Sequence, residues 1–270
     1  SQVLGLPRRT EGVGVMEKDR RDFLKLAGAS LLGLGGAAPA AALASAAGRP
    51  AHAEGTHWAM VVDTRKCAAK EGCTACSDAC HLAHNVPEIP DEAHEIKWIW
   101  KEEYPRAFPS QVHPYTEDSL RERNVPVLCN HCERPPCVRV CPTQATFKVE
   151  QGIVSIDMHR CIGCRYCVAA CPYGSRSFNW KDPRPHLEQI QPDYPTRTKG
   201  VVEKCNFCEE RLAKGRIPSC VEACAKAECG ALVFGDLNDP ESEVSRLLRT
   251  TNTIRRKPSL GTAPSVFYIV

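Results

Sequence analysis

The feature that most constrains this fold is a run of four cysteines within residues 161–171, followed at once by Pro172. Three further groups of four cysteines lie elsewhere in the 270 residues, so that only Cys229 of the 17 cysteines is left over. Repeated units of this kind depend on one another to bury their interior. The chain must therefore fold so that distant loops meet around whatever the cysteines bind.

All four groups consist of cysteines separated by short gaps, and they are numbered here in chain order. The first group is Cys67, Cys73, Cys76 and Cys80; the second is Cys129, Cys132, Cys137 and Cys141; the third is Cys161, Cys164, Cys167 and Cys171; the fourth is Cys205, Cys208, Cys220 and Cys224.

The spacing of the third group, with gaps of two, two and three residues before a proline, is typical of loops that wrap [4Fe–4S] clusters. The first three thiolates close on three corners of one cubane, and the fourth points away toward a second cluster. Zinc shares isolated pairs with this spacing but rarely explains four cysteines followed by proline. The groups therefore predict iron–sulfur clusters.

Composition and charge limit the other possibilities. The chain has 6% aromatic residues, 21 prolines and 18 glycines, so its hydrophobic core is expected to be small and to need clusters that tie segments together. Residues 1–53 hold seven Lys/Arg and four Asp/Glu, which leaves 28 of each in the rest. Thiolate-bound clusters add negative charge, so we expect no nucleic-acid partner.

The N-terminal region has the pattern of a targeting segment. We expect residues 1–15 to be upstream read-through and Met16 to be the native start. Arg20-Arg21 precedes Phe-Leu-Lys and an uncharged Ala/Gly/Leu-rich stretch, which predicts a twin-arginine (Tat) signal over 16–53 with cleavage after Ala53. The alternative is a membrane anchor, but the stretch is only mildly hydrophobic. The mature protein is then expected in the periplasm, held at the membrane by partner subunits.

Export raises a second interpretation, because cysteines in exported proteins usually form disulfides. The Tat route carries folded proteins, so clusters built in the reducing cytoplasm can be exported with their thiolates already occupied. Short cysteine loops also suit a disulfide framework poorly. We therefore favour clusters over disulfides.

The remaining segments predict an α+β fold with short hairpins and helices. We expect strands at 57–63 and 231–236 that pair, a hairpin across 145–157, and a short amphipathic helix at 243–248. The insertion at residues 84–124 is expected to be a packed surface loop. The alternative is a docking surface for a partner, in which Trp98 and Trp100 lie on one face of an edge strand. The expected domain boundaries follow the cysteine groups: one module at 54–83 plus 200–237 (first and fourth groups) and another at 125–182 (second and third groups). The other segments are the insertion at 84–124, a linker at 183–199 and a C-terminal extension at 238–270.

Several motifs give the chain a family resemblance. The sequences at 129–132, 161–167, 171–174 and 202–211 resemble the four-cluster iron–sulfur subunits that accompany molybdenum oxidoreductases and related membrane redox complexes. Within that family, the twin-arginine signal and residues 97–101 are most similar to periplasmic subunits of membrane complexes associated with sulfite reduction. The resemblance covers about residues 57–237.

The resemblance implies two ferredoxin-like modules that hold four [4Fe–4S] clusters in a chain, with the fourth cysteine of each group exchanged between paired groups. The implied sets are Cys129, Cys132, Cys137 and Cys171; Cys161, Cys164, Cys167 and Cys141; Cys67, Cys73, Cys76 and Cys224; and Cys205, Cys208, Cys220 and Cys80. Cys67 departs from the family pattern because five residues separate it from Cys73, although Gly72 allows a longer loop to fold back.

Other residues lie near the cysteine groups without being predicted as cluster ligands. Cys229 is expected to be a buried spare thiol, with ligation as the alternative. His81, His84 and His131 are expected to pack or to form hydrogen bonds. Together with Arg165 and Lys204, these histidines are candidates for adjusting cluster potentials.

The function that follows is electron transfer without catalysis, since fully ligated cubanes leave no open corner for substrate. The resemblance implies a quinone-interacting integral membrane subunit and a periplasmic redox protein, either a multihaem cytochrome c or a molybdoenzyme, as partners beside the Tat translocon. Alternatives are the same relay in a tetrathionate, polysulfide or nitrite reductase system, an enzyme with an open-site cluster, and a zinc or disulfide protein. No CxxC is followed by His, so the chain attaches no c-type haem.

Overall fold

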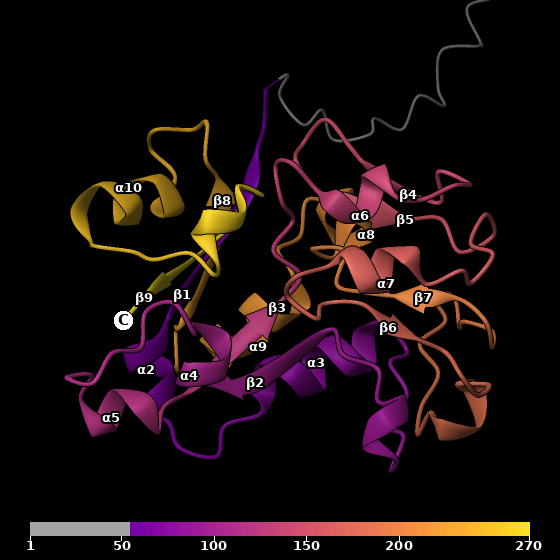
Figure 1. Cartoon of the computed structure of the whole chain (residues 1–270), viewed down its shortest axis with the longest axis horizontal. Helices are drawn as coiled ribbons and strands as arrows, with labels where there is room; N and C mark the ends of the chain where they lie inside the picture. Colours follow the sequence, from indigo (N-terminus) through magenta and orange to yellow (C-terminus); the bar gives the residue numbers. More distant parts are fainter. Residues whose placement is uncertain (1–54) are drawn as a thin grey trace, which may run out of the picture. The chain divides into compact units, whose positions relative to one another are not determined.

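The computed structural model describes residues 55–270. The predicted read-through segment and Tat signal lie outside the described residues. Within them the chain combines short helices with four small sheets, as the α+β prediction requires. Figure 1 shows the elements coloured in chain order, with the three-stranded sheet and the two smallest two-stranded sheets in separate regions of the fold.

The largest sheet has the strand order β8-β1-β9. Its middle strand β1 (Trp58–Asp63) pairs antiparallel with β8 (Leu232–Asp236), which confirms the predicted pairing, and parallel with β9 (Val266–Ile269). The strand ends where the Asp63 carboxylate accepts hydrogen bonds from the backbone N–H groups of Arg65 and Lys66, which caps the following helix.

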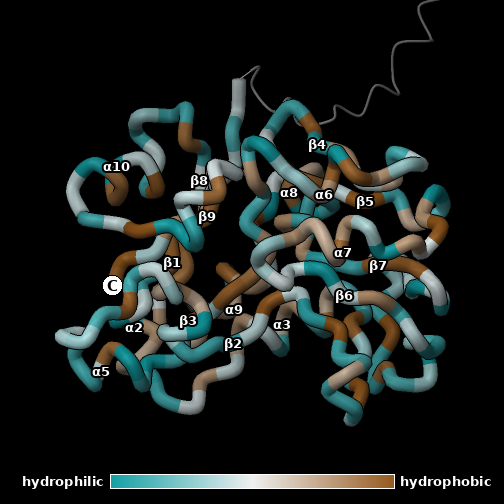
Figure 2. Tube along the Cα trace, in the orientation of Figure 1, coloured by the Kyte–Doolittle hydropathy of each residue, from teal (hydrophilic) through white to brown (hydrophobic). Residues whose placement is uncertain are grey.

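Both faces of β1 are buried. Met60 and Val62 face the main hydrophobic core, whereas Ala59 and Val61 face a second, smaller core with Val244 of α10 (Glu243–Thr250). A strand covered on both faces is apolar without alternation, as this segment is. Figure 2 shows the same concentration of apolar residues along the strands of this sheet.

The C-terminal extension differs from the predicted extended tail. Helix α10 forms as expected, capped by Ser242, whose Oγ accepts from the Ser245 N–H at 3.1 Å. The last residues then return to the sheet as β9, in which every residue is buried. The run Val-Phe-Tyr-Ile is apolar enough to have predicted a buried strand, but its partner β1 lies about 200 residues away in sequence.

The predicted hairpin forms from β4 (Thr146–Lys148) and β5 (Val154–Ile156), which pair antiparallel. Gly152 closes the turn with φ of +81°, and a Cβ at this position would lie 2.7 Å from the ring of His57. A glycine is needed here for both reasons. A second short pair joins β6 (Ser177–Phe178) to β7 (Val202–Glu203).

The insertion contributes to the main core. It forms β2 (Ile99–Glu103), which pairs antiparallel with β3 (Asn124–Leu128). Trp98, just before β2, is 1% exposed and Phe108 is fully buried, whereas Trp100 is only partly buried. The two tryptophans therefore differ in exposure, and the packed alternative describes the insertion better than a docking surface does.

Most helices are short, and two pairs bring the cysteine groups together. Helix α3 (Ala75–Ala83) packs against α9 (Ser219–Lys226), and α6 (Pro136–Arg139) packs against α7 (Tyr166–Ala170). The other helical segments are α2 (Thr64–Ala68), α4 (Tyr104–Ala107), α5 (Asp118–Arg121), α8 (Glu209–Leu212), and three 3-10 turns at Glu92–His94, Arg184–His186 and Pro258–Leu260.

These two helix pairs join the first group to the fourth and the second group to the third, the pairing that the sequence predicts. All described residues nevertheless belong to one compact unit, so the division into two modules stays a prediction. Within residues 55–270, none of the helices has the length and apolar character needed to span a bilayer.

Candidate metal centres

Four cysteines from two different groups line one small cavity, which we call site B: Cys129, Cys132, Cys137 and Cys171. The first three come from the second group, and Cys171 comes from the end of α7. Burial, followed by the neighbouring thiols, raises the pKa of Cys132 to about 12. Crowded thiols of this kind stay protonated until a metal replaces their protons.

A second cavity, site A, is lined by the complementary set: Cys141, Cys161, Cys164 and Cys167. Its loop turns at Gly163, where φ is +68° and an added Cβ would collide with the carbonyl oxygen of Gly200. Burial by itself would raise the pKa of Cys141, but hydrogen bonds from Thr146 and Thr143 outweigh it and lower that pKa.

The first and fourth groups form two further sets. Cys80 lies beside the thiols of the fourth group at site C: Cys80, Cys205, Cys208 and Cys220. Burial, and then the charges of these neighbours, raise the pKa of Cys80 well above its usual range. Every cysteine of site C is buried.

Site D contains the cysteine with the unusual gap: Cys67, Cys73, Cys76 and Cys224. Burial and then the neighbours Cys67, Cys224 and Cys73 raise the pKa of Cys76 to about 12. Cys67 lies in α2, and the chain turns back toward Cys73 through Gly72, whose φ is +69°. The longer loop therefore still brings Cys67 to the other three.

The four sites follow one another in the order A, B, C, D. Cys137 of site B adjoins Cys167 of site A, and Cys129 of site B adjoins Cys205 of site C. Cys76 of site D in turn adjoins Cys80 and Cys220 of site C. The arrangement gives neighbouring thiol groups from one end of the row to the other.

The donor chemistry of the two cavities fits an iron–sulfur cluster. Sites A and B each present four sulfur atoms, and among residues 55–270 no carboxylate or imidazole lines either cavity. Such soft ligand sets favour iron–sulfur clusters or zinc over hard cations. Asn130 lines the site B cavity, is 1% exposed, and has no hydrogen-bond partner for its amide within the described residues, as expected where a further acceptor belongs.

Comparison with known proteins decides between these metals. Residues 121–185, which contain every cysteine of sites A and B, match the family model described as a 4Fe-4S dicluster domain. An iron-sulfur subunit 1 of an Hdr-like menaquinol oxidoreductase from Archaeoglobus fulgidus is 47% identical over 232 residues, covering 80% of this chain and 84% of the relative. The chain belongs to the family of iron–sulfur subunits of membrane-associated redox complexes.

Other members of this iron–sulfur subunit family cover the chain to a similar extent. The iron-sulfur cluster-binding subunit of a menaquinone reductase from Nitratidesulfovibrio vulgaris is 39% identical over 78% of this chain and 88% of its own length. A tetrathionate reductase subunit from Salmonella typhimurium is 36% identical over 94% of this chain and 89% of its own length. The chain is accordingly a [4Fe–4S] electron-transfer subunit of an oxidoreductase complex and not its catalytic subunit.

Backbone N–H groups point at several of the sulfur atoms. The Thr146 N–H donates to Cys141 Sγ at 3.5 Å, that of Phe207 to Cys205 Sγ at 3.4 Å, and that of Ser219 to Cys208 Sγ at 3.4 Å. Hydrogen bonds to ligand sulfurs stabilise added negative charge and raise the reduction potential of a cluster.

His131 lies between sites B and C, where it was expected to pack. Its ring stacks on that of Phe207 with 3.7 Å between centroids, and its Nδ1 accepts from the Val154 N–H at 3.1 Å. Burial, and then the positive charges of Lys204 and Arg176, lower the pKa of His131 well below its usual range. His131 is therefore neutral, with its proton on Nε2.

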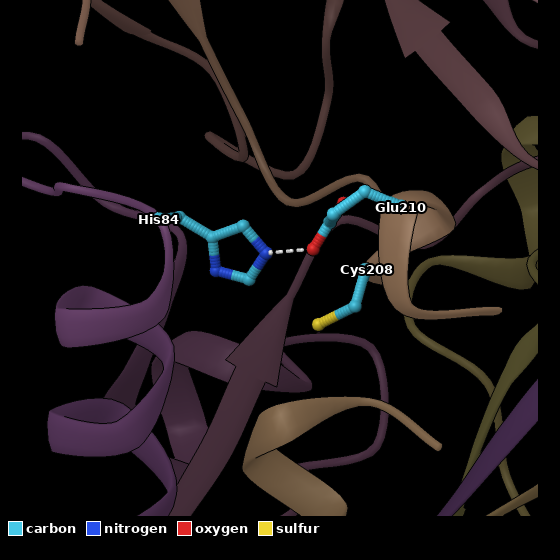
Figure 3. Close-up of side chains that lie close together, drawn as sticks. All are labelled: His84, Cys208 and Glu210. Carbon is cyan, nitrogen blue, oxygen red and sulfur yellow. Dashed lines mark hydrogen bonds and ion pairs between the residues drawn. The ribbon is translucent and has the colours of Figure 1, made fainter. Parts of the chain in front are cut away.

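His84, Cys208 and Glu210 lie close together beside site C, with ligand atoms within 4.8 Å of one another (Figure 3). His84 Nδ1 donates to the Cys80 carbonyl at 2.8 Å, and Nε2 donates to Glu210 Oε1 at 3.0 Å. Both ring nitrogens are thus engaged as donors, which makes the imidazole a cation paired with Glu210. The trio is better described as a hydrogen-bonded wall of site C than as a separate metal site.

Two secondary predictions concern residues near the outer sites. Cys229 is partly exposed, not buried: its thiol contacts Cys67 and Cys224 and donates to the Lys66 carbonyl at 3.6 Å. Arg165 is also exposed and stacks over the Trp180 ring at 4.5 Å, so its charge is screened by solvent.

Lys204 and His81 occupy different positions relative to the sites. Lys204 is 1% exposed, and its ammonium donates to the carbonyls of Val154 and Cys205 near site C. His81 is half-buried on α3, and burial lowers its pKa. Neither residue is a member of one of the four candidate ligand sets.

Three buried arginines were not expected from the sequence. Arg256 is 3% exposed, and its Nε donates to the Ala107 carbonyl at 3.1 Å. Arg176 follows the third group in the segment Pro-Tyr-Gly-Ser-Arg and is 4% exposed, and Arg197 lies in the predicted linker and is 2% exposed. Nothing in their local sequence separates them from the chain's exposed arginines. Their burial is a consequence of tertiary structure alone.

Proposed function

We propose that sites A to D each hold one [4Fe–4S] cluster, bound by the sixteen cysteines in the sets given above. The single observation that carries this proposal is the continuous row of four four-thiol sets, each adjoining the next. Bound there, the clusters would supply one-electron transfer along the row. The protein's own contribution is to hold the thiolates, exclude water from site C and set the electrostatic surroundings of the clusters.

Electrons are proposed to enter and leave at the two ends of the row. The cysteines of site C are all buried, whereas each of the other sites has at least one partly exposed cysteine: Cys141, Cys161 and Cys164 at site A, Cys129 and Cys171 at site B, and Cys73 at site D. The burial of site C protects the middle of the row from solvent oxidants, and the partly exposed cysteines of sites A and D leave both ends open to partner proteins. One end would face a quinone-interacting integral membrane subunit and the other a periplasmic redox protein.

The experiment that tests this proposal is the iron, sulfide and zinc content of anaerobically purified protein, with EPR during reductive titration. Four cubanes require about 16 iron and 16 sulfide per chain and interacting signals on reduction. Zinc without sulfide would contradict the proposal. About 12 iron would remove one site from the relay, and site D would be examined first because of the longer loop after Cys67.

We propose that this chain is DsrO, the periplasmic subunit of the sulfite-reduction-associated complex DsrMKJOP, and that the Tat translocon exports it. Three observations support this assignment: the twin-arginine sequence, the segment at 97–101, and the similarity to subunits of a menaquinol oxidoreductase and a menaquinone reductase. Co-purification with a membrane subunit and a multihaem cytochrome c is the expected result.

A second assignment has its own support. The similarity to the tetrathionate reductase subunit extends over 94% of the chain, and Protein NrfC of Escherichia coli is 38% identical over 80% of it. Both favour a relay in a tetrathionate reductase or nitrite-reductase system. Molybdopterin in the purified complex would exclude the DsrO assignment and establish a molybdoenzyme partner.

A further inference from the structure

Arg176 is a buried cation with no carboxylate partner among the described residues. It is 4% exposed, its Nη1 donates to Thr146 Oγ1 at 3.1 Å, and its Nη2 has no hydrogen-bond partner within residues 55–270. Arg197 shows the usual alternative, since this equally buried guanidinium forms an ion pair with the fully buried Glu203. The surroundings of Arg176 therefore lack the anion that such a group requires.

Burying the charged guanidinium of Arg176 costs much free energy of folding unless an anion lies beside it. An arginine cannot lose its proton to escape burial, so the charge of an unpaired, buried guanidinium is strongly destabilising even after the protein relaxes. The nearest groups that can become anionic are the thiols of Cys137 and Cys167. Cys137 belongs to site B and Cys167 to site A.

Arg176 lies in the wall between sites A and B. Arg176 lines the cavity of site B, while its partner Thr146 lines the cavity of site A. The Thr146 N–H also reaches Cys141 Sγ, a sulfur of site A, at 3.5 Å. One guanidinium is thus held by a buried hydroxyl at the point where two sulfur-lined cavities meet.

We propose that Arg176 is a shared counter-cation of sites A and B, which stabilises the extra negative charge that either site receives on reduction. The inference rests on the proposed function, since it requires clusters at both sites. A fixed positive charge in a buried environment raises the reduction potential of each neighbouring cluster. Electrons within the relay would then reside preferentially on the A–B pair.

The charge of Arg176 is held where solvent cannot screen it, in contrast to that of Arg165. Arg165 belongs to the loop of site A, but its guanidinium is exposed and stacks on Trp180. Charges exposed to water are screened by the solvent and by salt, whereas buried charges are screened far less. Arg165 nevertheless lines the cavity of site A, so the matched control is Arg184, an exposed arginine that pairs with Asp182 at the surface and lines neither cavity among the described residues.

The test compares three variants of the anaerobically purified, cluster-loaded protein by EPR-monitored redox titration. Arg176→Gln should lower two of the four potentials and leave the other two unchanged, and Arg184→Gln should leave all four unchanged. Arg176→Lys keeps the positive charge but moves it, so the reduction potentials of the clusters at sites A and B should change by unequal amounts. If a loaded Arg176 variant has wild-type potentials throughout, the proposal is wrong.

Iron and sulfide contents distinguish the possible failures. If Arg176→Gln does not retain iron, the titration of Arg176→Lys decides the question. An unmodified protein with far less iron than four clusters need would contradict the proposed function and not the role of Arg176. A uniform fall of all four potentials in Arg176→Gln, with full iron content, would also overturn the proposal, because it would indicate a general change in solvent access.

Discussion

Arg197 and Glu203 form an ion pair with 2.6 Å between Nη2 and Oε2, and neither side chain is exposed to solvent. Glu203 also accepts hydrogen bonds from Trp98 Nε1 at 3.0 Å and Asn179 Nδ2 at 2.6 Å. Arg197 donates to the carbonyls of His84 and Asn85. The pair therefore connects the predicted linker, the insertion and β7 beside site C.

Glu203→Gln is expected to destabilise the protein by about 3–5 kcal/mol, because it leaves a buried guanidinium without its counter-ion. The measurement is the denaturant midpoint of the loaded protein under anaerobic conditions. Asp182→Asn is the control, since Asp182 pairs with Arg184 at the surface and such pairs contribute little. Equal midpoints for the two variants would contradict the structural role of the buried pair.

The pair of His84 and Glu210 predicts a pH dependence. Burial by itself lowers the pKa of His84, but hydrogen bonds with Cys208 and Glu210 outweigh it and raise the pKa to about 9. A raised pKa means that folding favours the protonated ring. This contribution to stability is complete below about pH 6.5 and is lost as the pH rises through about 9.

The denaturant midpoint of the wild-type protein should therefore fall between these pH values, and that of His84→Gln should fall less. His113→Gln is a suitable control because His113 lies in the insertion and is not part of this pair. A His84→Gln variant with the full wild-type pH slope would show that His84 is not protonated in the folded protein.

The proposed export by the Tat route gives a prediction for the segment that precedes the described residues. Replacing Arg20 and Arg21 by Lys keeps the positive charge but removes the twin-arginine sequence. The protein should then accumulate in the cytoplasm with its iron content unchanged, as measured by cell fractionation. Lys18→Arg with Lys25→Arg is the control that alters basic residues outside the pair. Undiminished periplasmic protein in the twin-Lys variant would contradict Tat export.

Local patterns were sufficient to predict a large part of the fold. Alternating apolar residues on both sides of Gly152 predicted the β4–β5 hairpin, and helical periodicity predicted α10. The pairing of β1 with β8 followed from two isolated apolar runs. The hairpin, the helix and the separate strands are each specified within a few residues, where sequence patterns are most informative, although β1 and β8 are distant in sequence.

The features that could not be predicted depend on other contacts between distant segments. Strand β9 joins β1 only because the C-terminal segment returns to the sheet, and a short apolar run does not identify its partner. The charged residues Arg176 and Arg197 look like surface residues in sequence, since burial of a charge depends on anions brought from elsewhere in the fold. The spacing of the third group predicts that its fourth cysteine serves a second cluster, and the resemblance to the family supplied the complete sets of ligands.

The exchange of the fourth cysteines predicts how single substitutions distribute between the sites. Cys171→Ser should remove or alter the cluster at site B, although Cys171 belongs to the same run as the cysteines of site A. The expected result is the loss of about four iron, or a converted three-iron signal, with the site A cluster intact.

Cys229→Ser is the matched control, because Cys229 contacts Cys67 and Cys224 without belonging to any of the four proposed sets. Its iron content and EPR spectrum should equal those of the wild type. Cys161→Ser completes the comparison: it should affect site A, and its residual spectrum should differ from that of Cys171→Ser. Identical spectra for these two variants would mean that the third group binds a single cluster without exchange.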